Sequence, residues 1–311
     1  MHVPTANPKV TFATLVLETK PHSLWSAPWS WETSIVLPLA LLLLVYVSGA
    51  VRRGSWHILR WRHASFFSGW FSLALALTSP IPELGEQLFS AHMLQHEILI
   101  LVSAPLISAA HPAATCLWAF GPRQRVYVGG WIHAVESTRL VRFVTRPLTA
   151  WSLEAFALWI WHIPALYQAA LTSDWAHAAQ HLSFLLTALL FWSALYGIGR
   201  SSMAYAAATV YVFGTAIHCS GLGALLTFST VLWYPAYASS TQSWGLTPLQ
   251  DQQLGGLIMW VPSAVVFILI GLVLFASWIV EAGGRQRHSS LQAVLDNAKG
   301  EHLETPIHRP W

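Results

Sequence analysis

Two pairs of histidines at helical spacing are the residues in this chain best suited to chemistry. His92 and His96 stand in the sequence HMLQH, and His177 and His181 stand in HAAQH. On an α-helix, side chains four residues apart lie on one face, one turn above the other. Two imidazoles placed in this way can bind the same metal ion, so each pair predicts part of a metal site.

Further donor atoms occur in neighbouring apolar segments. His162 is followed by Pro164, which frees a backbone carbonyl nearby, and His218 is followed by Cys219. We expect one metal site near the outer ends of the helices, formed by six histidines: His92, His96, His162, His177, His181 and His218. The candidate accessory groups are Met93, Glu97, Cys219, Asp251 and Met259.

Three acidic residues near these positions have structural roles that compete with metal binding. Glu97 can orient an imidazole as a hydrogen-bond acceptor, or relay protons. Asp251 opens the last apolar segment, where it can cap a helix as well as bind a metal. We expect Glu154 nearer the cytoplasmic end, paired with Arg146 or another interfacial group.

The other histidines and the cysteines fit structural roles. Single histidines at a membrane interface usually anchor the chain or form hydrogen bonds. We expect this of His22, His57, His63, His111 and His133. The two cysteines, Cys116 and Cys219, are expected at different depths, which argues against a disulfide.

The set of donors favours copper. Imidazole combined with thioether or thiolate suits copper best among biological metals, ahead of zinc and haem iron. The zinc-protease motif HExxH is absent, because Met93 follows His92 where the general-base glutamate would stand. Two other functions stay open. Histidines on different helices can hold a haem for electron transfer, and a metal or proton transporter would use polar residues such as Glu154 and His111.

The composition requires a membrane setting for these residues. Of the 311 residues 55% are hydrophobic and 9% are charged, against about 25% charged in a soluble domain. Several apolar runs approach the roughly 20 residues that cross a bilayer. We therefore expect an all-α polytopic membrane protein in contact with lipid. The net charge of +3 does not indicate nucleic-acid binding, because most basic residues separate apolar runs.

The apolar runs predict a bundle of seven transmembrane helices. They cover residues 31–51, 64–78, 91–117, 150–167, 178–198, 203–227 and 255–280. Arginines alternate with apolar residues in 118–149, a pattern typical of an interfacial helix. The predicted domains are a short extracytoplasmic segment over 1–30, the helical domain over 31–281, and a polar, loosely ordered cytoplasmic tail over 282–311.

The basic residues predict the orientation of the bundle. With seven crossings, 14 of the 16 lysines and arginines fall on one side, and only Lys9 and Lys20 fall on the other. Positive residues are retained in the cytoplasm. The N-terminus is thus expected outside and the C-terminus in the cytoplasm, in a multi-pass protein of the bacterial cytoplasmic (inner) membrane.

Several of these stretches together resemble one known family. They are HMLQH at 92–96 with Pro105 downstream, WHIPALY at 161–167, HAAQHLSF at 177–184, and DQQL at 251–254 running to MWVP at 259–262. The stretch 218–228, with Tyr234 and Pro235 after it, belongs to the same pattern. Over residues 30–280 the chain is similar to the seven-helix CtaG assembly factors of caa-type cytochrome c oxidase.

The resemblance implies a role in maturing a haem-copper terminal oxidase through its copper centre, without enzymatic activity. The implied partners are subunits of that oxidase, with a periplasmic copper chaperone as a further candidate. The sequence departs from the family at one point, because Gln180 stands where many members carry glutamate. A neutral group therefore lies beside His177 and His181.

Overall fold

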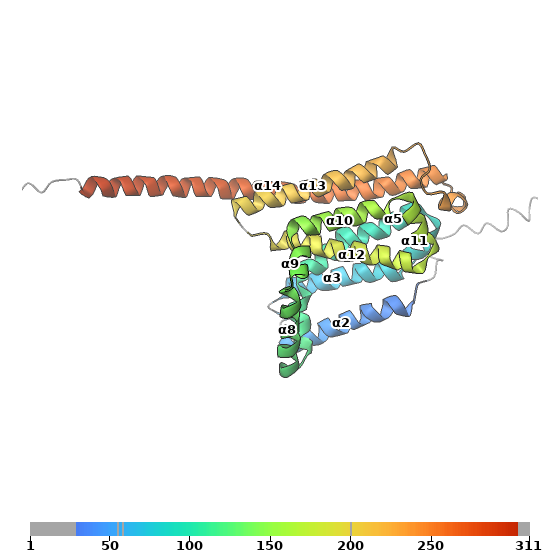
Figure 1. The fold of residues 1–311 in the computed structure, drawn as a ribbon, viewed down its shortest axis with the longest axis horizontal. Helices are drawn as coiled ribbons and strands as arrows, with labels where there is room; N and C mark the ends of the chain where they lie inside the picture. The colour runs from blue at the N-terminus through green and yellow to red at the C-terminus, as the bar shows by residue number, and fades with distance from the viewer. Residues whose placement is uncertain (1–28, 55, 58, 200, 304–311) are drawn as a thin grey trace, which may run out of the picture.

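The described part of the chain is a bundle of long helices. The computed structural model describes residues 29–54, 56–57, 59–199 and 201–303, and within these ranges it contains helices and no strand. Most of the helices run side by side along one direction (Figure 1). In this part five helices are long and apolar enough to cross a membrane, and one bent pair is a sixth candidate. The all-α polytopic membrane class is confirmed.

The predicted apolar runs correspond to the helices of the bundle, with shifted ends. The spans are α2 (Thr33–Arg53), the bent pair α3 (Arg60–Thr78) and α4 (Ile81–Gln87), the continuous Phe89–Ala110, α12 (Asp174–Gly197), α13 (Ser202–Thr227) and α14 (Pro248–Leu303). The remaining run is α10 (Pro147–Trp161), which has 15 residues and is shorter than the roughly 20 that cross a bilayer. The count of seven spans therefore stays a prediction.

The span Phe89–Ala110 changes its winding and ends earlier than predicted. It consists of α5 (Phe89–Glu97), the π-helix η1 (Ile98–Ser103) and α6 (Ala104–Ala110). Pro105 lacks a backbone N–H, so the regular hydrogen-bond ladder cannot continue through it. Trp192 donates to the Ile100 carbonyl at 2.9 Å within this wider turn. The span stops at Ala110 because His111 adopts the left-handed conformation and Pro112 follows.

The predicted run 150–167 is interrupted at its outer end. Helix α10 ends at Trp161, and α11 (Pro164–Thr172) starts a new helix. Pro164 excludes the helical conformation from the residue before it, and Ile163 is accordingly extended, with ψ of 125°. The Tyr234 hydroxyl donates to the carbonyl of His162 at 2.8 Å. His162 thus lies just after α10 rather than within its last turns.

Two short helices lie across one end of the bundle. They are α8 (Pro122–Glu136) and α9 (Arg139–Val144), which follow α7 (Pro112–Cys116) and η2 (Leu117–Ala119) (Figure 1). Exposed apolar residues such as Tyr127 and Trp131 alternate with arginines, as expected of an interfacial helix. Arg52, in the last turn of α2, donates to the Ala119 carbonyl at 2.6 Å. Lys9 and Lys20, which are predicted to lie on the other side of the membrane, are outside the described residues.

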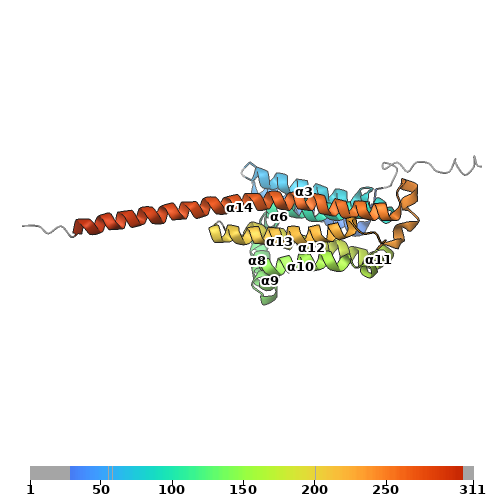
Figure 2. The ribbon, with the colours of Figure 1, turned by 90° about the horizontal axis from the view of Figure 1, so that it is seen from above.

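Helix α14 extends far beyond the bundle. Figures 1 and 2 show it projecting past the end where α8 and α9 lie. The expectation of a loosely ordered tail is wrong as far as Leu303, where the helix ends. Residues 282–303 contain no proline, and good helix formers such as Ala, Gln, Arg and Leu outnumber the three glycines, so the stretch can continue the helix.

Small residues bring α14 close to the helices beside it. A Cβ atom on Gly256 would lie 2.6 Å from the Thr227 nitrogen of α13, and one on Gly223 would lie 2.7 Å from the Trp260 Cβ. Gly255 faces α5, because a Cβ there would meet Met93 at 3.2 Å. Small residues at such crossings allow backbones to pack closely within a membrane. The packing places the start of α14 against α5.

The predicted orientation is tested by placing single cysteines at the two ends of the bundle. In a protein whose Cys116 and Cys219 are replaced by alanine, Ser173→Cys between α11 and α12 should react with a membrane-impermeant maleimide in intact spheroplasts. Ser137→Cys between α8 and α9 should react only after the membrane is permeabilised, because both serines are exposed but lie at opposite ends. The reverse labelling would contradict the orientation.

Candidate metal centre

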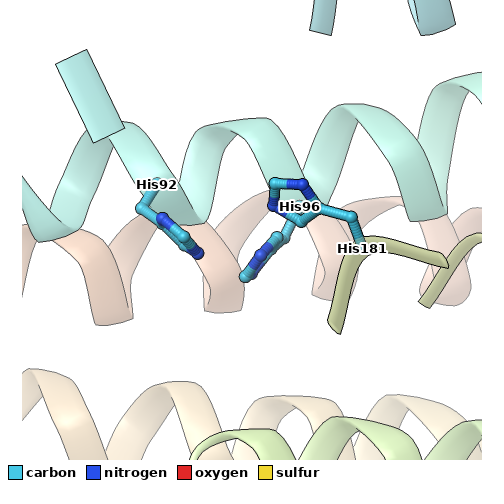
Figure 3. Close-up of side chains that lie close together, drawn as sticks. All are labelled: His92, His96 and His181. Carbon is cyan, nitrogen blue, oxygen red and sulfur yellow. The ribbon is translucent and has the colours of Figure 1, made fainter. Parts of the chain in front are cut away.

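Three histidines from two helices converge near the starts of α5 and α12. One ring nitrogen each of His92, His96 and His181 lies within 4.8 Å of the other two (Figure 3). The rings of His92 and His96 are 4.4 Å apart between centroids, and that of His181 is 5.1 Å from His96. The i, i+4 spacing on α5 thus places two imidazoles against a third from α12.

His177 and His162 extend this group. The His177 ring lies 4.3 Å from that of His181 and 5.4 Å from that of His92. The His162 ring lies 6.4 Å from that of His96. Five of the six predicted histidines are therefore brought together. His177 and His181 stand near the start of α12, which follows α11 at the end of the bundle opposite α8 and α9 (Figure 1).

Five of the ten ring nitrogens in this group have no hydrogen-bond partner within the described chain. They are Nε2 of His92, His177 and His181, and both nitrogens of His96. A buried polar atom without a partner costs about 1–3 kcal/mol. His92 and His96 are each only 2% exposed, so solvent does not offset this cost. A metal ion bound by these nitrogens would satisfy them.

His162 is held in the orientation typical of a metal-binding histidine. Its Nδ1 lies 2.6 Å from the Leu158 carbonyl, which can only accept, so Nδ1 carries the proton. In the neutral ring Nε2 then keeps its lone pair, and it lies 3.4 Å from the Met93 sulfur. A backbone carbonyl that fixes the tautomer in this way is a common partner of metal-ligating histidines. His162 and Met93 therefore place one nitrogen and one thioether side by side.

Asp251 is not available as a ligand because it caps another helix. Its carboxylate accepts the backbone N–H of Phe89 at 2.6 Å and that of Ser90 at 3.2 Å, and the Ser90 hydroxyl at 2.5 Å. These N–H groups at the start of α5 have no partner within their own helix. Asp251 was expected to cap its own helix. It instead fixes the helix that carries His92 and His96.

Tyrosines from two segments, α11 and the loop that contains η3, pack beside the group. Tyr237 lies in the 3-10 helix η3 (Pro235–Ala238) and donates to the Gly85 carbonyl at 3.0 Å. Its hydroxyl therefore accepts from Tyr167 at 2.9 Å, and burial raises the pKa of Tyr237, which keeps it protonated. The His92 ring packs on the edge of Tyr167 at 5.3 Å. Sequence patterns did not single out Tyr237, since loop residues have no helical period.

His218 lies apart from the other five histidines. Its Nε2 is 3.4 Å from Oε2 of Glu154, and its Nδ1 is 3.7 Å from Sγ of Cys219. His218 is nine residues before the end of α13 at Thr227, about 14 Å along the helix. It thus lies deeper than His92, three residues after the start of α5. The expected pairing of Glu154 with Arg146 is wrong, since Glu154 lies beside His218.

The other accessory groups are buried in different surroundings. Glu97 accepts a hydrogen bond from the Ser263 hydroxyl of α14 at 3.0 Å. Met259 is 4% exposed and belongs to the apolar core. Gln180 is fully buried, and neither amide atom has a hydrogen bond to the part of the chain that the structure describes. Its polar ends therefore add to the unsatisfied groups near His177 and His181.

The fold and the buried imidazoles define a polytopic helical membrane protein with a candidate metal centre. Comparison with known families is consistent with that class. A sequence model of the cytochrome c oxidase caa3 assembly factor family, CtaG, matches residues 41–281. The chain belongs to this family, and the resemblance seen in its motifs is confirmed.

The chain is also similar to longer mycobacterial proteins. It is 25% identical over 260 residues to uncharacterized proteins of Mycobacterium leprae, Mycobacterium bovis and Mycobacterium tuberculosis. The match covers 80% of this chain and 39% of each relative. The chain thus spans about two fifths of the length of these relatives. No solved structure matches it.

Removing the Asp251 carboxylate should destabilise the start of α5. We expect Asp251→Ala to lower the free energy of unfolding by about 2–4 kcal/mol, because it leaves buried N–H groups without an acceptor. The measurement is thermal unfolding of the purified protein, followed by tryptophan fluorescence. Asp174→Ala, an exposed aspartate at the start of α12, is the control and should cost less than about 1 kcal/mol. Equal effects of the two changes would contradict the capping role.

Proposed function

We propose that this protein supports the maturation of a haem-copper terminal oxidase by binding copper at His92, His96 and His181 and passing it to the oxidase. The observation that carries the proposal is the convergence of these three rings within 4.8 Å. Membership of the assembly-factor family supplies the biological setting. The family's role is consistent with a protein that is not an enzyme, and copper handover requires no bond to be made in the protein.

The donor set supports copper over harder cations. Imidazole nitrogens and thioether sulfur bind soft or borderline ions, whereas magnesium and calcium prefer oxygen. Met93 is fully buried and its sulfur lies beside Nε2 of His162. Zinc shares the affinity for imidazole but gains little from a thioether, so Met93 favours copper.

The number of donors supports transfer rather than permanent binding. The five clustered histidines are more than the three whose ligand atoms converge, so some of them are free to bind an ion before or after it reaches those three. His177 and His181 are partly exposed, whereas His92 and His96 are 2% exposed. An ion can therefore exchange stepwise from the accessible rings of α12 to the buried rings of α5, and return by the same steps. We infer that it is exchanged at the periplasmic side of the inner membrane with a periplasmic copper chaperone as donor and an oxidase subunit as acceptor.

The geometry argues against the haem alternative. A haem bound by two of the three convergent rings would need its planar macrocycle between them. The third ring already occupies that space, since all three ligand atoms lie within 4.8 Å of one another. A transporter would need a polar path from the histidines to the opposite end of the bundle, beside α8. His111, which terminates α6, is the histidine considered for such a path.

Loss of the α5 histidines should remove copper and oxidase assembly together. In His92→Ala/His96→Ala, we expect copper affinity to fall by at least about 100-fold, since loss of even an outer partner of a metal ligand costs 10–100-fold. Copper is measured by elemental analysis of purified protein after dialysis against a competing chelator. Oxidase assembly is measured as terminal oxidase activity in membranes of cells that express the variant.

The control for this experiment is His133→Ala, which removes an exposed histidine of α8. It should keep both copper and oxidase activity. Unchanged copper content in the double variant would remove these histidines from the site. Normal oxidase activity in a copper-free double variant would contradict the functional proposal.

A further inference from the structure

A second group of metal-binding side chains lies deeper in the bundle. It consists of Glu154 on α10 and His218 and Cys219 on α13. One ligand atom from each lies within 4.8 Å of the other two. Glu154 is 5% exposed and Cys219 is 8% exposed, so the group is enclosed by protein. Oxygen, nitrogen and sulfur donors thus meet at one point.

This group is separate from the histidines near the bundle end. Glu154 precedes His162 by eight residues on the same chain segment, about 12 Å along a helix. The described ring neighbour of His218 is Trp151, at 5.4 Å and edge-on, rather than another histidine. The two groups also come from different helix pairs, α10 with α13 and α5 with α12.

The side chains of the group satisfy one another only in part, since the weak hydrogen bond between Nδ1 of His218 and Sγ of Cys219, at 3.7 Å, leaves other polar atoms unpartnered. Oε2 of Glu154 and Nε2 of His218 are 3.4 Å apart, and neither forms a hydrogen bond with any described residue. The indole nitrogen of Trp151 is also buried without an acceptor in the described chain. Ionisable groups within a membrane protein are costly and usually mark a function. Two unsatisfied polar atoms, one of Glu154 and one of His218, therefore lie 3.4 Å apart inside the bundle.

The distance between Oε2 of Glu154 and Nε2 of His218 matches the distance between two ligand atoms of one metal ion. Zinc binds carboxylate oxygen and imidazole nitrogen at about 2.0–2.2 Å in tetrahedral geometry, which separates the two ligand atoms by about 3.4 Å. A charge-assisted hydrogen bond between the same groups would be shorter, at about 2.7–2.9 Å. The distance between Glu154 and His218 agrees with the first arrangement.

We propose that Glu154, His218 and Cys219 form a second metal site, which binds a divalent transition metal ion of the zinc class. A carboxylate and a thiolate supply two negative charges, and the imidazole is neutral. A divalent ion cancels these charges, which matters because uncompensated charge inside a low-dielectric bundle is costly. A monovalent copper ion would leave one negative charge. The donor set thus distinguishes this site from the imidazole and thioether site at His92.

The test uses Co²⁺ as a coloured probe for the zinc-class site. The full chain is reconstituted in lipid nanodiscs with reduced thiols and titrated with Co²⁺. We expect a thiolate-to-cobalt charge-transfer band that Zn²⁺ abolishes. Cys219→Ser should remove the band, whereas Cys116→Ser, which changes the only other cysteine, should keep it. Glu154→Gln should weaken Co²⁺ binding by at least about tenfold.

His92→Ala/His96→Ala should keep the band, so failure of the copper site and failure of this site are distinguished. A wild-type protein without the band overturns the proposal, and so does a band that survives Cys219→Ser. If Cys219→Ser does not fold, the Co²⁺ affinity of Glu154→Gln is the deciding measurement, because glutamine keeps the size and shape of the side chain. Unchanged Co²⁺ affinity in folded Glu154→Gln also overturns the proposal, since Glu154 would then be only a structural partner of His218.

Discussion

The contact between Asp251 and the first residues of α5 is the interaction on which the candidate metal centre depends. Helix α5 begins after Leu88, whose apolar side chain cannot accept a hydrogen bond. The carboxylate of Asp251, from 161 residues further along the chain, accepts the free N–H groups of Phe89 and Ser90. Its negative charge also opposes the positive end of the helix dipole. The start of α5 is thereby fixed against α14, which sets the position of His92.

The tyrosines around the histidine group are hydrogen-bonded, whereas several imidazole nitrogens and the amide of Gln180 are not. Tyr167, Tyr237 and the carbonyl of Gly85 form one chain of hydrogen bonds, and Tyr234 accounts for the carbonyl freed by the break before Pro164. A single metal ion would satisfy several of these nitrogens at once, so they support the proposed site.

The sequence predicts local features of this protein well and long-range ones poorly. Hydropathy predicts the membrane class, and the spacing of His92 and His96 predicts a shared face, because both follow from the helical repeat. The break before Pro164 is also local and could have been placed from the proline alone. The capping of α5 by Asp251 could not have been predicted in this way, because the two segments are far apart in the sequence and neither one identifies its partner. The depth of His218 depends on how α13 packs on its neighbours, so its separation from the other histidines needed the structure.

The central claim is that the buried imidazoles near the start of α5 bind copper directly. X-ray absorption at the copper edge tests this claim most directly, on the wild-type protein loaded with one equivalent of copper. The account predicts two or three nitrogen ligands at about 2.0 Å, with the outer-shell scattering that imidazole rings produce. A first shell of oxygen or sulfur ligands without imidazole scattering would contradict it.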